Sequence, residues 1–364
     1  MELNDIFFSK LAEEKESAKI NISFFYTLTK EYKNKNEKFL AYTFVRRAEK
    51  IKNCLNYWEW YLYELNKVKD LRKVYRCKDI FCPNCRIVNM SKAIVNFIPV
   101  FNRMRTAGYT PYHLVLTVPN IPKEELSDCI KRMNKAFLKL WRWISKDFKR
   151  NGSYYGGFSQ RLYKAVAAIK VLEVTVQKTD WNYLHVHFHV MIFLEKENKD
   201  LFIKDIPGGY QYRTDSNIYY SLADIFTQKL WKKAYDDASI KEFKNASDDW
   251  KDNYICSMTE IKDTSGLYEV FKYCFKDIDI KNLDIFRCLV FGLKNKRIRQ
   301  GYGILHNINV DDKEINDDEI SKKDDINNYL EFKDELPVIA TNNFKDNFEK
   351  DGDYRKVSIS KEKS

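Results

Sequence analysis

The sequence contains no apolar run long enough to span a membrane, no repeat and no apolar leader. Its longest apolar stretches fall short of the ~18–20 residues that a transmembrane helix needs. Residues 1–10 carry charges and no apolar core, so we expect no signal peptide and predict a cytoplasmic protein without a membrane partner. The absence of a repeat at solenoid or propeller periods excludes those architectures.

Cysteine and histidine are both scarce. Eight cysteines in 364 residues are too few for a disulfide scaffold, and clustered cysteines in the cytosol more often bind a metal. Only five histidines occur, and three of them lie between residues 185 and 189. Hydrophobic residues make up 44% of the chain, which excludes wholesale disorder, and the length predicts two domains or one catalytic domain with appendages.

Charge is unevenly distributed along the chain. The formal net charge is +11, but residues 311–364 hold 16 acidic and 10 basic side chains. Residues 1–310 therefore hold 53 basic and 36 acidic side chains. A basic body with an acidic tail indicates a polyanionic partner, most often nucleic acid.

Hydrophobic periodicity predicts a mixture of helices and strands. Apolar residues at three- and four-residue spacing predict helices over 1–70, 91–104, 123–148, 219–235 and 265–277. Apolar runs rich in β-branched residues predict strands over 113–118, 167–176, 184–194 and 257–262, with the two middle strands forming a hairpin. After residue 309 the composition becomes acidic and Asn-rich, which predicts a partly disordered tail.

The strongest chemical signal is the run His185-Val186-His187-Phe188-His189. Side chains alternate along a strand, so the three imidazoles share one face while Val186 and Phe188 point to the core. Two imidazoles and a ligand from a neighbouring strand can bind a divalent ion. Glu173, on the adjacent predicted strand, and His185 are the two candidates for the third ligand.

A second signal lies on the predicted helix over residues 265–277. At about 100° per residue, Glu269, Lys272, Tyr273 and Lys276 share one face. A phenol is a poor nucleophile at neutral pH, but nearby lysines and a metal-polarised phosphate make its attack feasible. Glu269, one turn from Tyr273, is placed to act as a general base towards water.

The third signal is the cysteine cluster. A Cys-Pro-x-Cys turn at Cys82 and Cys85 is typical of half a tetrahedral zinc site. Cys77 and Cys54 can complete a structural Zn²⁺ site, or His113 can replace one of them. A redox role for Cys82 and Cys85 is the alternative, because a helix is predicted after them.

Basic side chains also gather near residue 296. The run Lys-Asn-Lys-Arg-Ile-Arg over residues 294–299 is suited to phosphate backbones. We predict DNA contacts there and on the helix of Tyr273. The residues concerned are Lys272, Lys296, Arg297 and Arg299.

These motifs, in this order, resemble one family. The cysteine cluster is followed by Leu-Val-Leu-Thr-Val-Pro-Asn at residues 114–120, by a Leu-Glu-Val-Thr strand, by the His-rich strand and by Glu-x2-Lys-Tyr-x2-Lys. Over residues 50–305 this resembles the rolling-circle plasmid replication initiators of Gram-positive bacteria, within the HUH (His-hydrophobic-His) endonuclease superfamily. By that resemblance His187 and His189 match the metal-binding motif, Tyr273 the nicking nucleophile and Glu269 the acidic residue before it. Val186 departs from the pattern, since proline is usual there.

The resemblance implies a function. Such a protein captures a hairpin or single-stranded nick site at the double-strand origin and cuts one strand with Mg²⁺ or Mn²⁺. Tyr273, helped by Lys276, would form a 5′-phosphotyrosyl link and leave a 3′-OH primer for the host helicase and polymerase. Glu269-activated water or strand rejoining would end the cycle. The implied location is the bacterial cytoplasm.

The fold implied is α+β. A central antiparallel sheet would carry the His-rich strand, with flanking helices that include the Tyr273 helix, and with an appended zinc-binding element. We predict a helical N-terminal region with the cysteine element over 1–105, a nicking and ligation domain over 106–309 and an acidic tail over 310–364.

Three other functions remain open at this point. An HUH transposase would generally show paired tyrosines, and a conjugative relaxase places its nucleophile before the His motif. A non-catalytic zinc-containing DNA-binding regulator would form no covalent DNA adduct.

Overall fold

The structure is a computed structural model of the whole chain. It describes residues 3–63, 68–145, 149–150, 153–154, 163–177, 180–197, 199–207, 219–238, 254–263, 266–267, 270, 282–306, 338–343 and 355–357. The chain divides into two compact units, one of Met1–Val95 with Asp312–Ser364 and the other of Asn96–Asp311. We call them unit 1 and unit 2.

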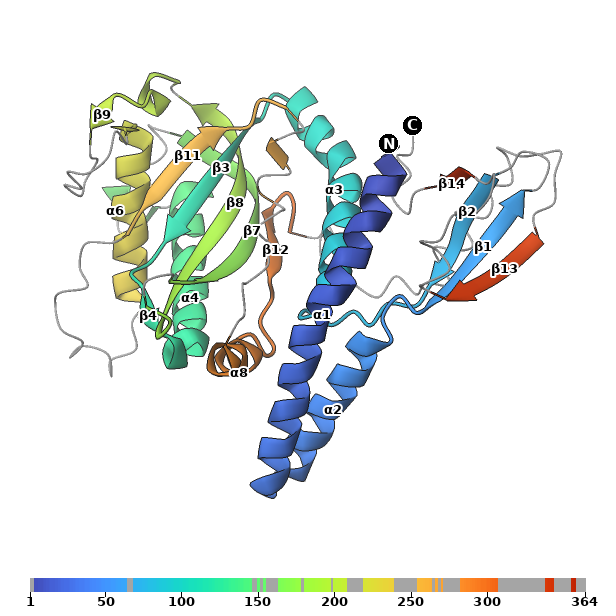
Figure 1. Cartoon of the computed structure of the whole chain (residues 1–364). Helices are drawn as coiled ribbons and strands as arrows, with labels where there is room; N and C mark the ends of the chain where they lie inside the picture. Colours follow the sequence, from blue (N-terminus) through green and yellow to red (C-terminus); the bar gives the residue numbers. More distant parts are fainter. Residues whose placement is uncertain are drawn as a thin grey trace. The chain divides into compact units, whose positions relative to one another are not determined.

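Unit 2 is built on an antiparallel sheet with the strand order β11-β3-β8-β7-β12 (Figure 1). The strands are β3 Thr110–Thr117, β7 Tyr163–Val176, β8 Tyr183–Glu197, β11 Cys256–Glu260 and β12 Arg299–Gly303, and the two-residue β4 Ile121–Pro122 also pairs with β8. The His-rich strand β8 is therefore central. The predicted α+β class with a central antiparallel sheet is confirmed.

The remaining elements of unit 2 are helices and short pieces. The helices are α4 Leu126–Ser145, α6 Leu222–Asp237 and α8 Leu283–Gly292, with 3-10 turns η1 Lys123–Glu125 and η2 Lys199–Phe202. Two-residue strands pair as β5 Lys149–Arg150 with β6 Ser153–Tyr154, and β9 Ile206–Pro207 with β10 Tyr219–Tyr220. Helix α3, Pro83–Thr106, begins in unit 1 and ends in unit 2.

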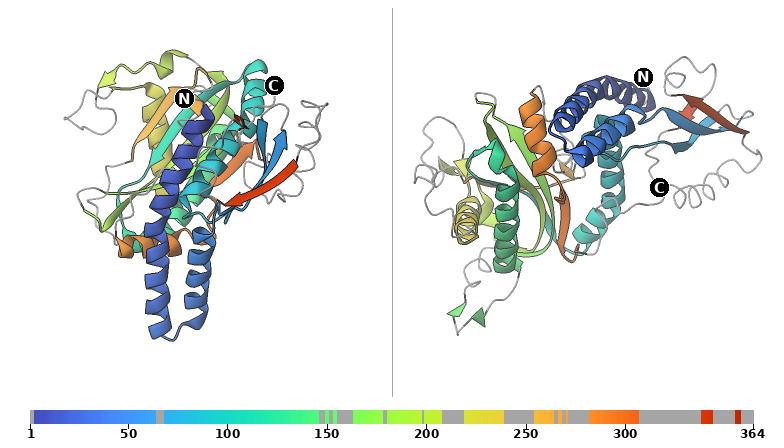
Figure 2. Two further views of the ribbon diagram at one scale, coloured as in Figure 1. Left: turned by 45° about the vertical axis from the view of Figure 1, so that its right-hand side comes forward. Right: turned by 90° about the horizontal axis from the view of Figure 1, so that it is seen from below.

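Helices α4 and α6 cover one face of this sheet, as Figures 1 and 2 show. Phe188 of β8, on that face, packs edge-on against Phe137 of α4 and Trp231 of α6. The indole N–H of Trp231 donates to the carbonyl of Thr117 at 2.7 Å, which satisfies the one polar atom of that buried ring. The face opposite the histidines therefore carries a core that α4 and α6 cover.

The sequence of α4 explains why it lies there. Its buried side chains recur every three or four residues from Leu126 to Ile144, so they form one apolar stripe. Helix α6 is fixed differently. Ser221 and Asp224 form a capping box at its start, and the Asp224 carboxylate also accepts from the backbone N–H of Met258 at 2.6 Å, which ties the helix to β11.

A glycine ends the edge strand β12. Gly303, the last residue of β12, has φ +61°, and a Cβ there would lie 2.1 Å from the carbonyl oxygen of Val166. Only glycine tolerates both the left-handed backbone and this close approach.

Unit 1 contains a helical hairpin and a small sheet. Helices α1 Leu3–Asn34 and α2 Lys38–Lys52 are joined by a turn in which Asn36 has φ 59°. Phe25 of α1 packs against Phe44 of α2, with ring centroids 6.1 Å apart. The sheet has the order β13-β1-β2-β14. Its strands are β1 Tyr57–Tyr63, β2 Val68–Val74, β13 Val338–Asn343 and β14 Arg355–Val357.

The prediction that residues 1–70 are helical is wrong beyond α2. Residues 57–63 and 68–70 are extended, because the Tyr-Trp-Glu-Trp-Tyr-Leu-Tyr run of β1 is rich in aromatic residues that favour strands. Two segments of the acidic C-terminal region, β13 and β14, are strands as well. The boundaries predicted at residues 105 and 309 stay predictions, while the two compact units part at Val95 and Asp311.

Within the part of the chain that the structure describes, no helix combines the length and apolarity that crossing a membrane requires.

Candidate metal centres

The first candidate site forms where β7 and β8 pair. Glu173 lies directly opposite His187, and Val171 lies opposite His189. Residues directly opposite each other in an antiparallel pair share a face, so the carboxylate and both imidazoles project from the same side of the sheet. One ligand atom from each of Glu173, His187 and His189 lies within 4.8 Å of the others. We call these three residues the histidine–glutamate cluster.

The cluster is buried and held together by hydrogen bonds. Glu173 Oε2 contacts His187 Nε2, and it lies 2.8 Å from His189 Nε2. Burial alone would raise the pKa of the Glu173 carboxyl, but hydrogen bonds with His187 and His189 outweigh it and lower that pKa to about 2. The carboxylate is therefore charged at neutral pH, with two imidazole nitrogens aimed at one of its oxygens.

The chemistry of this donor set fits a divalent cation. Two imidazoles and one carboxylate supply three ligands of mixed N and O type and leave further coordination positions for other oxygens. His187 Nδ1 is buried and has no hydrogen-bond partner among the described residues, while its Nε2 turns to Glu173. Of the two candidates for the third ligand, the structure brings Glu173 to the pair. His185 stacks beside His187, with ring centroids 4.8 Å apart, and is not part of the group.

A fourth histidine, which the sequence did not place here, lies beside the cluster. His113 of β3 contacts His189, with Nε2 and Nδ1 2.9 Å apart. The two residues are 76 positions apart, and only the β3–β8 pairing brings them together. No local motif could have found this contact, although the predicted strand over 113–118 contained the residue.

The second candidate site, the cysteine cluster of Cys54, Cys77, Cys82 and Cys85, lies in unit 1. Cys54 precedes β1 and Cys77 follows β2, so the antiparallel pairing of these strands places both at the same end of the hairpin. The backbone N–H of Leu55 donates to the carbonyl of Tyr75 at 2.8 Å and extends that pairing to the cysteines. Cys82 directly precedes α3 and Cys85 lies in its first turn, where Pro83 suits the first helical position.

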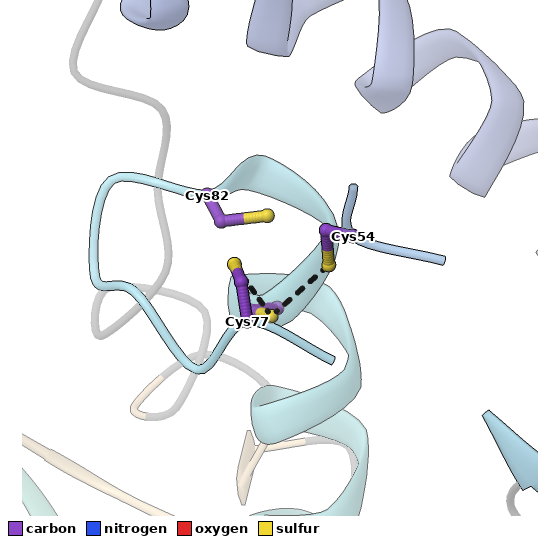
Figure 3. Close-up of side chains that lie close together, drawn as sticks. Cys54, Cys77 and Cys82 are labelled. Carbon is purple, nitrogen blue, oxygen red and sulfur yellow. Dashed lines mark hydrogen bonds between the residues drawn. The ribbon is translucent and has the colours of Figure 1, made fainter. Parts of the chain in front are cut away.

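The four sulfurs are spaced for one tetrahedral ion (Figure 3). Cys85 Sγ lies 3.5 Å from Cys54 Sγ and 3.6 Å from Cys77 Sγ. Zinc–thiolate bonds of about 2.3 Å place the sulfurs of a tetrahedral site about 3.8 Å apart. In Figure 3 the labelled side chains of Cys54, Cys77 and Cys82 point toward one another. The residues therefore fit a four-thiolate zinc site.

The surroundings of the cysteine cluster favour one thiolate, at Cys54. Lys15 Nζ donates to the carbonyl of Cys54 at 2.5 Å, and the N–H of Lys78 donates to Cys85 Sγ at 3.3 Å. Hydrogen bonds from Cys77 and Cys82 lower the pKa of the Cys54 thiol. The same contacts with Cys54 raise the pKa values of the Cys77 and Cys82 thiols. Crowding thus disfavours a second thiolate on its own, and a dication is the partner that relieves it.

Two sequence-based alternatives for the cysteines are not supported. His113 does not replace a cysteine, because it contacts His189 in unit 2 while all four cysteines come together in unit 1. Cys82 and Cys85 do not form an isolated redox pair either, since two more thiols share their site. Each described cysteine is a free thiol.

The predicted nucleophile helix lies largely outside the described residues. Gly266, Leu267 and Val270 are helical, and the side chains of Leu267 and Val270 are buried. The residues predicted to share its functional face, all outside the described part, are Glu269, Lys272, Tyr273 and Lys276.

The other predicted DNA contacts differ in exposure. Arg297 is exposed and Lys296 is half-buried. Arg299 is buried in β12 opposite Val171, on the histidine face of the sheet rather than at the outer surface. The predicted DNA-contact roles of Lys296, Arg297 and Arg299 stay predictions.

Comparisons with known proteins agree with the resemblance inferred from the motifs. Residues 68–206 match the family of replication proteins, a segment that contains the histidine–glutamate cluster, His113 and three of the four cysteines. "Protein rep" of Staphylococcus aureus is 27% identical over 220 residues, which cover 59% of this chain and 76% of that protein. "Protein rep" of a Bacillus species is 28% identical over 302 residues, which cover 79% of this chain and 87% of that protein. No solved structure matches the chain.

The family match and the two relatives confirm the resemblance predicted from the motifs: the chain is similar to the rolling-circle plasmid replication initiators of Gram-positive bacteria.

Proposed function

We propose that the chain is a metal-dependent HUH-type nickase that starts plasmid replication by cutting one strand of its origin DNA. The observation that carries the proposal is the histidine–glutamate cluster on the central strand, inside the segment that matches replication proteins. The net basic charge of residues 1–310 supports a DNA partner.

Glu173, His187 and His189 would hold Mg²⁺ or Mn²⁺. The bound ion would polarise the scissile phosphate as a Lewis acid and orient it. The chain's own part is to keep the three ligands together: the β7–β8 register fixes their spacing, and burial excludes water from the charged carboxylate. Because imidazole nitrogen suits manganese better than magnesium, Mn²⁺ is the better candidate.

Tyr273 is the proposed nucleophile. Its phenolic oxygen loses a proton and forms a bond to phosphorus, while the bond from phosphorus to the 3′ oxygen breaks. The 3′ oxygen takes up a proton and leaves as the free hydroxyl. The host polymerase would extend this primer while the host helicase unwinds the duplex ahead of it. The broken phosphodiester is conserved as a 5′-phosphotyrosine, so strands can be rejoined without a nucleotide cofactor.

Three neighbours of Tyr273 on the predicted helix would assist. Lys272 and Lys276 bring positive charge to the phosphate, and Glu269 would accept a proton from the water that ends the cycle. The cysteine cluster would bind Zn²⁺ as a structural ion that joins the β1–β2 hairpin to the start of α3.

A nicking assay tests the proposal. Purified full-length protein is incubated with Mn²⁺ and supercoiled plasmid that carries the replicon's own origin, and products are separated with and without detergent and protease. We expect a nicked circle with protein bound covalently to its 5′ end. Tyr273→Phe should abolish the nicked circle and the covalent adduct. Tyr268→Phe, five residues away on another side of the predicted helix, should abolish neither.

The same assay separates the other functions. Nicking that persists in Tyr273→Phe contradicts the nucleophile assignment, and nicking unaffected by His187→Ala contradicts metal catalysis. Tight origin binding with no cleavage and no adduct identifies a non-catalytic DNA-binding regulator.

A further inference from the structure

Each ring nitrogen of His189 has its own partner. Nε2 lies 2.8 Å from Glu173 Oε2, inside the histidine–glutamate cluster. Nδ1 lies 2.9 Å from Nε2 of His113, and the two rings are 5.2 Å apart with their planes 32° from parallel. His113 is not one of the clustered ligands, and it meets the site through His189.

The strand register accounts for this contact. His113 of β3 lies opposite Met191, two residues beyond His189 on β8, while Val115 lies opposite His189. His113 and His189 are therefore diagonal neighbours on one face, a separation that ring side chains bridge. Both rings are carried by adjacent strands of the central sheet, so the contact follows from the β3–β8 pairing.

The chemistry of imidazole gives this contact a direction. A histidine that binds a cation through Nε2 offers the lone pair there and must carry its proton on Nδ1. That N–H needs an acceptor, and Nε2 of His113 is placed to be one when His113 carries its own proton on Nδ1. Such a bond selects the metal-binding tautomer of His189, orients the ring and makes it a stronger ligand.

His187 provides an internal contrast. Its Nδ1 is buried with no hydrogen-bond partner among the described residues. Of the two histidine ligands, His189 is thus the one whose second nitrogen is engaged by a side chain from another strand.

We infer that His113 is a positioning residue that holds His189 in the tautomer and orientation needed to bind a divalent cation. The inference rests on the proposed metal site and adds a residue to it. Loss of such an outer hydrogen bond typically weakens metal affinity 10- to 100-fold.

Direct Mn²⁺ binding tests the inference without reference to nicking. Full-length, zinc-loaded protein is titrated with Mn²⁺, and free Mn²⁺ is measured by electron paramagnetic resonance. We expect His113→Leu to weaken binding about 10- to 100-fold. His113→Gln, whose side-chain oxygen is also an acceptor, should bind within about threefold of the wild type, since it restores the partner of Nδ1.

Thr259→Val is the matched control, because Thr259 lies opposite His113 on β11 and is exposed. It should bind Mn²⁺ as the wild type does. Thermal unfolding of each variant shows whether the fold is kept. If His113→Leu is unstable, His113→Gln provides the test. The inference is overturned if His113→Gln is stable but binds Mn²⁺ as weakly as His187→Ala does.

Further outcomes separate this inference from the proposed function. If His187→Ala loses Mn²⁺ but His113→Leu binds normally, the metal site stands and the role of His113 is overturned. If the wild type does not bind Mn²⁺, or His187→Ala binds equally well, the metal site fails and the inference fails with it.

Discussion

Glu173 and His187 are directly opposed across the β7–β8 pair, and Glu173 Oε2 contacts both His187 and His189. One carboxylate oxygen thus joins two imidazoles that lie two positions apart on a single strand. The arrangement depends on register, because a slip of one residue would move Glu173 to the opposite face of the sheet. The candidate site is therefore a property of strand pairing as much as of residue type.

The third ligand can be identified by substitution. Glu173→Gln keeps the shape of the side chain but removes the negative charge, so Mn²⁺ affinity should fall at least ~10-fold. His185→Gln should change it less than about threefold, since His185 stacks beside His187 without joining the group. The exposed Glu195 of β8 gives the control Glu195→Gln. Equal losses in the Glu173 and His185 variants would contradict the assignment.

Zinc content tests the cysteine cluster. Wild-type protein purified from zinc-supplemented cells should contain about one zinc per chain, and Cys85→Ser should contain close to none, because a tetrahedral thiolate site needs all four sulfurs. The variant Cys288→Ser, at a cysteine of α8 that does not belong to the cluster, should keep its zinc. A strong chelator should lower the melting temperature of the wild type but not that of Cys85→Ser. Zinc-free wild-type protein with an unchanged melting temperature would show the cluster to be apolar packing only.

We expect Lys170 to make the free energy of unfolding depend on pH. Burial lowers the pKa of its ammonium from 10.5 to about 7, and its neighbours are Asn134 and the rings of Phe137, Phe188 and Tyr302. Between pH 7 and 10.5 the unfolded chain retains a proton that the folded chain has released. The free energy of unfolding should therefore rise with pH in that window and lose this contribution below it.

Lys170→Met removes the titration. Relative to this variant, the wild type should gain stability from pH 6 to pH 10, by up to roughly 4 kcal/mol for a pKa shift of this size. Urea unfolding at three pH values measures the difference. Lys135→Met, at an exposed position of α4, should show none. Parallel pH curves for the wild type and Lys170→Met would mean that the buried ammonium is not destabilised.

Termination is the step assigned to Glu269. Glu269→Gln should still nick origin DNA at a rate near that of the wild type, because Tyr273 is unchanged. Without a base to activate water, replication should run past one round and yield strands longer than unit length. Denaturing gels of replication products measure their length, with the exposed Glu260→Gln as control. Unit-length products from Glu269→Gln would remove the residue from the mechanism.

The sequence predicted most of unit 2, because its signals are local. The strands over 113–118, 167–176, 184–194 and 257–262 all match observed strands, and the helix over 123–148 corresponds to η1 and α4. Alternation of His185, His187 and His189 sufficed to place their side chains on one face. Glu173 was a candidate ligand for the same reason, since it lies on the next strand.

What the sequence could not give depends on contacts between distant residues. His113 reaches His189 across 76 positions through the β3–β8 register. The helix predicted over β1 rests on apolar residues at three- and four-residue spacing, whereas the strand is held by pairing with β2 and with β13 from residues 338–343, far along the chain. Pairing with so distant a segment leaves no periodic signal in either one, so spacing within the run was a misleading guide.

Strands β13 and β14 carry a consequence for biosynthesis. They form the two edges of the unit 1 sheet, yet they are translated after the whole of unit 2. The ribosome would thus release the whole of the unit 2 sheet while β1 and β2 still lack both outer partners. Until the last residues emerge, these two strands have unpaired edges of the kind that recruit other chains. Correct completion of unit 1 is therefore a late event, and an early stop codon would leave the β1–β2 hairpin with both edges unpaired in a chain whose unit 2 is complete.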